Sequence, residues 1–73
     1  MIPRIRELLH LAPFQPFNIR TSDGREYPIP TADHAAVHPN IPRVVVFLDN
    51  GGQVELAPLH LAAVVRNGNV ETG

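Results

Sequence analysis

The sequence predicts a mainly β fold, in which a short N-terminal helix precedes a small, strongly bent, five-stranded antiparallel sheet or barrel. Two turn motifs carry this prediction, Ser22-Asp23-Gly24-Arg25 and Asp49-Asn50-Gly51-Gly52. Each is flanked by short runs rich in β-branched and aromatic residues. Asp-Gly and Asn-Gly supply the left-handed backbone angles that tight hairpin turns require. The short chain has room for one core, so residues 1–73 are expected to form one domain.

The N-terminal helix is predicted over residues 1–12. Pro3 is compatible with the first turn of a helix. The apolar residues of this segment recur at helical spacing and are Ile2, Ile5, Leu8, Leu9 and Ala12. The helix is expected to stop before Pro13, because the residue that precedes a proline is disfavoured in the α region.

A first hairpin is predicted at residues 17–30. Phe17, Ile19 and Thr21 alternate with polar residues, as in a half-buried strand. The returning strand contains Pro28 and Pro30, which cannot donate hydrogen bonds to a neighbouring strand. We therefore expect this strand to lie at the edge of the sheet.

A second hairpin is predicted from residues 43–48 and 53–56. The first of these segments is an apolar, β-branched run, and the second alternates polar and apolar residues. Four consecutive apolar residues, from Val44 to Phe47, predict burial on both faces of the strand. The second face would be covered by the N-terminal helix or by another subunit.

The remaining segments are shorter. Residues 31–34 are expected to form a turn or a single 3₁₀ turn, and residues 35–38 a brief third strand or an irregular segment. A corner at 57–60 and a last strand at 61–66 complete the predicted barrel, which spans residues 17–66. Residues 67–73 are expected to form a frayed tail.

The length, cysteine content and charge of the chain exclude some classes of protein. The 73-residue chain has no cysteine, and a domain of this size buries only about 60% of the surface of its unfolded chain. With disulfides and thiolate metal sites excluded, self-association is the expected supplement to stability. The formal net charge is −1 and the isoelectric point is about 6.4, which argues against a strongly basic nucleic-acid binder.

The segments 17–30, 43–56 and 58–65 resemble the barrels of Sm-like and SH3-like proteins, and a family of small bacterial proteins with no assigned function. In bacterial Sm-like proteins of the Hfq type, a Lys-His pair opens the last strand, binds uridine-rich RNA and lies in a ring of subunits. Leu59 and His60 align with that pair, so the histidine matches and the lysine does not. The resemblance implies an RNA-binding surface at His60, with Arg20 and Arg43 as further candidates.

No catalytic, cofactor or metal site is predicted. Ser22 is the only serine and lies in a turn, and the sequence lacks the paired groups that nucleophilic or acid–base catalysis requires. His34 and His38 have the spacing of metal ligands on a helix, but the following Pro39 disfavours a helix, and no third ligand is near.

The preferred hypothesis is a cytoplasmic, non-enzymatic, self-associating β-barrel that acts as an interaction or regulatory module, with a protein partner. No apolar segment approaches the ~20 residues that cross a membrane, and no signal peptide is evident. The alternative is an Sm-like RNA-binding ring.

Overall fold

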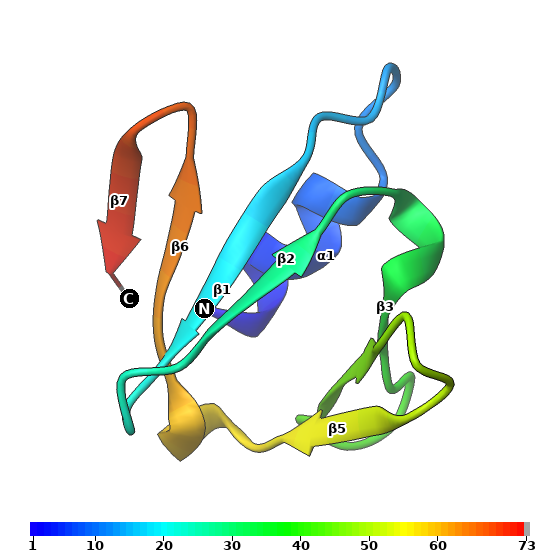
Figure 1. Ribbon diagram of the computed structural model, residues 1–73, viewed down its shortest axis with the longest axis vertical. Coiled ribbons are helices and arrows are strands. Elements are labelled where there is room, and N and C mark those ends of the chain that lie inside the picture. The colour runs from blue at the N-terminus through cyan, green and yellow to red at the C-terminus, as the bar shows by residue number, and fades with distance from the viewer. Residues whose placement is uncertain (73) are drawn as a thin grey trace.

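The computed structural model describes residues 1–72 and shows one α-helix followed by seven strands (Figure 1). The helix is α1 (Ile2–Leu9). The strands are β1 (Phe17–Thr21), β2 (Glu26–Ile29), β3 (Ala35–Val37), β4 (Val44–Phe47), β5 (Gln53–Leu56), β6 (Leu61–Arg66) and β7 (Asn69–Thr72). Two 3₁₀ helices, η1 (Ala32–His34) and η2 (Pro58–His60), precede β3 and β6. Within residues 1–72, no helix has the length and apolar character needed to cross a membrane.

The strands lie in two antiparallel sheets, with the orders β2-β1-β6-β7 and β3-β4-β5. The expected single five-stranded sheet or closed barrel is therefore wrong, because the pairs formed by residues 1–72 leave both sheets open. The outer strands β2 and β5 approach each other without pairing. Pro28 explains part of this gap, since it lacks the N–H group that a ladder on its outer side requires.

The first hairpin is confirmed. β1 and β2 pair in an antiparallel register, and the residues of β1 alternate between buried and half-buried positions. The Thr21 N–H donates to the Arg25 carbonyl at 2.8 Å. Since bonded pairs alternate along an antiparallel ladder, the main chain of Pro28 points away from β1. β2 is an edge strand, as its prolines predict.

The second hairpin is also confirmed, but within residues 1–72 only one face of its first strand is buried, so cover of the second face by another subunit stays a prediction. Val44 and Val46 of β4 are buried, whereas Val45 is half-buried and Phe47 is 40% exposed. In the described residues α1 packs against β3 of this sheet, on the core side. Nothing within residues 1–72 therefore buries the outer side of Phe47.

The predicted tail is wrong for the described residues. Residues 69–72 form β7, which pairs with β6 in the register Arg66↔Asn69. Asn67 and Gly68 connect the two strands with φ angles of 50° and 78°, as a two-residue hairpin turn of the primed type requires. This Asn-Gly dipeptide is a third hairpin signal. Gly73 lies outside the described residues.

The core lies between α1 and the inner faces of the sheets. Its fully buried large side chains are Ile5, Leu8, Ile19, Ile29, Val44, Val46 and Val64. Every α-helical and β-sheet layer contributes to this set, which agrees with the apolar faces predicted for the helix and the first strand.

α1 ends three residues before the predicted limit of residue 12. The His10 N–H donates to the Glu7 carbonyl at 3.1 Å, and the His10 Nδ1 atom hydrogen-bonds to the Arg6 carbonyl at 2.8 Å. These contacts satisfy carbonyls of the last turn and replace a further helical turn. The 3₁₀ turn and brief strand at 32–37, the corner at 58–60 and the strand at 61–66 are confirmed.

Candidate interaction site

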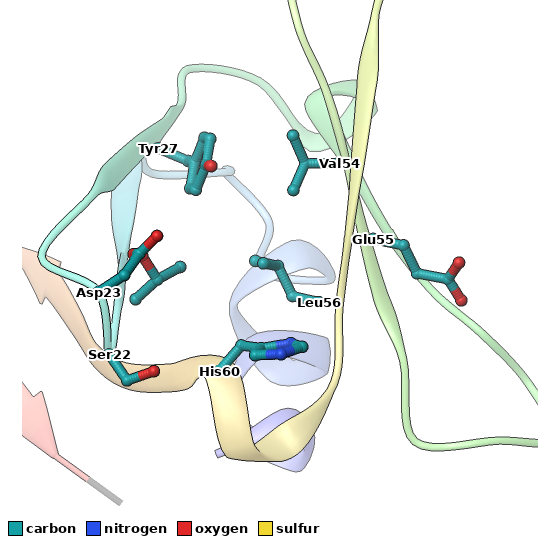
Figure 2. Close-up of a pocket in the computed structure, with 8 residues that line it drawn as sticks. Ser22, Asp23, Tyr27, Val54, Glu55, Leu56 and His60 are labelled. Atoms are coloured by element: carbon teal, nitrogen blue, oxygen red, sulfur yellow. The ribbon is translucent and has the colours of Figure 1, made fainter.

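A hollow of about 220 Å³ lies between the first hairpin, β5 and η2 (Figure 2). Its walls combine apolar, aromatic and polar groups. It is lined by Thr21, Ser22, Asp23, Tyr27, Val54, Glu55, Leu56 and His60. The hollow thus occupies the gap that separates the outer strands of the two sheets.

The apolar walls come from alternation in β2 and β5. Tyr27 of β2 and Val54 and Leu56 of β5 point into the hollow from opposite sides (Figure 2). Val54 and Leu56 are two residues apart and therefore project on the same face of their strand. Glu55 points away from the hollow in Figure 2, so it borders the hollow with its main chain.

The main chain of β5 presents free hydrogen-bonding groups at this edge. The Leu48 N–H donates to the Gly52 carbonyl at 2.8 Å, which sets the phase of the β4–β5 ladder. Because bonded pairs alternate, the backbone groups of Gln53 and Glu55 point outward, on the side that has no partner strand. β5 has no proline, unlike β2.

His60 is held at the base of the hollow by its local structure. Its Nδ1 atom accepts a hydrogen bond from the Ala57 N–H at 3.1 Å. The His60 carbonyl accepts from the Ser22 N–H at 2.9 Å, which ties η2 to the first hairpin. With Nδ1 as the acceptor, the neutral ring carries its proton on Nε2 and presents a donor.

The turn of the first hairpin carries a carboxylate at the rim. Asp23 accepts hydrogen bonds from the Thr21 hydroxyl and, at 3.3 Å, from the Arg25 N–H. The bond from Thr21 and then that from Arg25 lower the pKa of the Asp23 carboxyl below its ordinary value. Asp23 is thus ionised at neutral pH and already engaged by its own turn.

Leu59 stands out among the apolar side chains of η2. It is 77% exposed, more than any other large hydrophobic residue described. Its neighbour His60 lines the hollow. η2 therefore contributes His60 to the lining of the hollow and carries an exposed apolar side chain at the preceding residue.

The structure does not gather the three RNA-binding candidates into one hollow. His60 lines the hollow, and neither arginine does. Arg20 bonds to Glu26 at 3.2 Å on the outer face of the four-stranded sheet. Arg43 lies 3.8 Å from Glu55 and donates to the Pro42 carbonyl.

The two histidines with metal-ligand spacing separate into different networks. His34 contacts the Thr31 hydroxyl at 2.7 Å and the Asp49 carboxylate at 3.1 Å. The His38 Nδ1 atom accepts from the Asn40 N–H at 3.0 Å. Residues 1–72 contain no cluster of three such side chains that could hold a metal ion.

Sequence reasoning missed the roles of Tyr27, Val54 and Leu56 as walls of one hollow. Their alternation is visible in each strand, but nothing local shows that β2 and β5 face each other. The exposure of Leu59 likewise has no local signal in the sequence and is seen only in the structure.

Comparison with protein-family models, curated proteins and solved structures found no match to this protein.

Proposed function

We propose that this protein is a non-enzymatic interaction module that self-associates through the edge of β5. The observation that carries the proposal is an outer strand that lacks proline and borders a partly apolar hollow, with Leu59 exposed beside it. A free strand edge is a template for pairing with another polypeptide. The hollow and Leu59 add apolar surface that such a contact would remove from water.

The charges along β5 favour one way of pairing two copies. An antiparallel arrangement with Glu55 opposite Glu55 would place like charges directly across from each other, which is destabilising. An arrangement with Gln53 of each copy opposite the partner's Glu55 avoids this repulsion. In this arrangement the outward N–H and C=O groups of the two β5 strands can hydrogen-bond to each other, and the Val54 residues of the two copies lie opposite each other.

The size of the protein supports self-association as well. A domain of 73 residues without cysteine has a small core and no covalent cross-link. Phe47 adds apolar surface on the outer face of the same three-stranded sheet. Pairing with a second copy would extend that sheet into one of six strands, so each chain would gain a neighbouring strand without any additional sequence.

We describe the fold as an open variant of the small Sm-like or SH3-like barrel. Support comes from the order of its elements, with a 3₁₀ corner at η2 before β6 and pairing of β6 with β1. The β6–β7 hairpin and the unpaired edges of β2 and β5 are its departures from a closed five-stranded barrel.

The test is the solution mass of the full-length protein, measured by light scattering after size exclusion over a range of concentrations. We expect a dimer that dissociates on dilution. Glu55→Pro removes an outward N–H and should give a monomer, whereas Glu55→Ala keeps that N–H and should remain dimeric. Circular dichroism establishes that both variants are folded. A monomeric parent protein at all concentrations, or a dimer in both variants, would refute pairing at β5.

The RNA-binding ring makes different predictions in the same experiment. Tyr27 and His60 are flat rings in one hollow, and such rings can stack on bases of single-stranded RNA. A ring-sized mass with excess absorbance at the nucleic-acid wavelength would favour this alternative. His60→Ala should then weaken RNA binding, and added salt should do the same, because phosphate contacts release counterions.

A further inference from the structure

The β6–β7 turn has a second chemical feature besides its backbone angles. The sequence has two Asn-Gly dipeptides, Asn50-Gly51 and Asn67-Gly68, each in a hairpin turn with an exposed asparagine. In such a dipeptide the glycine nitrogen can attack the asparagine side chain, because glycine offers no Cβ to obstruct the approach. The two sites differ in what holds the reacting groups.

At Asn50 both reacting groups are engaged in hydrogen bonds. The Asn50 Oδ1 atom accepts from the Gly52 N–H at 2.8 Å. The attacking nitrogen, that of Gly51, donates to the Leu48 carbonyl at 3.1 Å. The side chain and the following amide must both be released before they can react.

At Asn67 neither reacting group is held in this way. Among the contacts of residues 1–72, no hydrogen bond engages the Asn67 side chain or the Gly68 N–H. The turn leads into β7, whose residues 69, 70 and 72 are exposed, so local opening needs little loss of packing.

We propose that Asn67 is a site of spontaneous deamidation, with Asn50 protected by its turn. The Gly68 nitrogen loses its proton and attacks Cγ of Asn67. A C–N bond forms in a five-membered succinimide, and the bond between Cγ and Nδ2 of Asn67 breaks to release ammonia. Water then adds to one of the two ring carbonyl carbons and opens the ring, which leaves aspartate or isoaspartate at residue 67.

The isoaspartate product would change the C-terminal hairpin. Its backbone passes through the former side chain and has one additional methylene group, so a two-residue turn can no longer keep Arg66 opposite Asn69. β7 would then lose its register. With β7 displaced, Glu71 would be drawn away from Arg4, whose Nε atom donates to it at 2.8 Å. The modification would thus loosen the contact between α1 and β7.

The test is incubation of the full-length protein at mildly alkaline pH, followed by peptide mass mapping and an isoaspartyl methyltransferase assay. Each hydrogen bond that must open first slows the reaction several-fold, so we expect Asn67 to convert about tenfold faster than Asn50. Asn67→Gly retains a residue that accepts positive φ and should abolish the early product. Asn50→Gly should leave that product unchanged.

Three outcomes would overturn this assignment. The first is that Asn50 converts as fast as Asn67, and the second is that the early product persists in Asn67→Gly. The third is that an unstructured peptide with the sequence of residues 64–71 converts, whereas neither site of the folded protein reacts. In the isoaspartate product we expect a lower thermal midpoint. The aspartate variant Asn67→Asp, with a backbone of normal length, should retain most of the stability of the parent protein.

Discussion

The two sheets protect their outer strands by different means. In the four-stranded sheet, β2 carries Pro28 and is followed by Pro30, and β7 is joined to α1 by the Arg4–Glu71 pair. In the three-stranded sheet, β3 packs against α1, whereas β5 has neither proline nor a covering element on its outer side. β5 therefore combines a proline-free outer edge with a position beside the hollow.

The greatest loss of stability is expected at the buried centre of the four-stranded sheet rather than at the edge of the other. Ile19 is fully buried in β1, whereas Val54 in β5 is half-buried. Ile19→Ala should lower the free energy of unfolding by about 2–5 kcal/mol, and Val54→Ala by about 1 kcal/mol. Urea denaturation measures both values. Equal losses would show that the two sheets contribute alike to the core.

The second prediction concerns association without a change in folding. Leu59→Ser removes the most exposed large apolar side chain, so the free energy of unfolding of the monomer should change by no more than about 0.5 kcal/mol. If the protein pairs as proposed, the dimer of this variant should dissociate at a higher protein concentration than the dimer of the parent protein. Dilution series followed by light scattering measure this shift. An unchanged dissociation constant would place Leu59 outside the interface.

The third prediction concerns the proline that keeps the outer edge of β2 from pairing with another strand. Pro28→Thr restores an outward N–H at this edge, so β2 should become a second pairing edge and produce species larger than the dimer. Pro16→Thr, in the connector before β1, is the matched control and should leave the mass unchanged. Light scattering at high concentration distinguishes them. A dimer in both variants would mean that the prolines are not what protects β2.

The most modest change is expected at the ion pair that joins β7 to α1. The hydrogen bond from Arg4 lowers the pKa of Glu71 below its ordinary value, and nearby charges on Arg4 and Arg66 add to the shift. A carboxylate with a lowered pKa in the folded state contributes stability above its unfolded pKa, and this contribution is lost as pH falls through the folded pKa. The thermal midpoint should therefore decline in the acid range.

Glu71→Gln should remove part of that decline, so the thermal midpoint of this variant should depend less on pH than that of the parent protein. Arg4→Gln removes the same pair from the other side, and the double variant should show no further flattening. Thermal melts at a series of pH values provide the measurement. Additive effects of the two substitutions would show that Arg4 and Glu71 act independently.

A dipeptide of Asp or Asn followed by Gly occurs at all three hairpins, but only the first two of these dipeptides were used to predict a hairpin. Asp23-Gly24 and Asn50-Gly51 led to correct hairpins, in which the glycine has positive φ and the residue before it does not. Asn67-Gly68 differs, because both of its residues have positive φ in a two-residue turn. The segment after Asn67 is short and partly polar, so its own composition is a weak signal of a strand. Pairing with β6 provides the ordering that the segment alone does not show.

Local patterns in the sequence are sufficient to predict most of the secondary structure of this protein. Alternation in β1, glycine in the turns and prolines in β2 act over a few residues, so the hairpins and the edge position of β2 follow from them. The three-dimensional structure was needed to show that β2 and β5 face each other without pairing, and that Tyr27 meets Val54 across a hollow. These relations depend on packing between residues far apart in the sequence, where many arrangements satisfy the same local preferences.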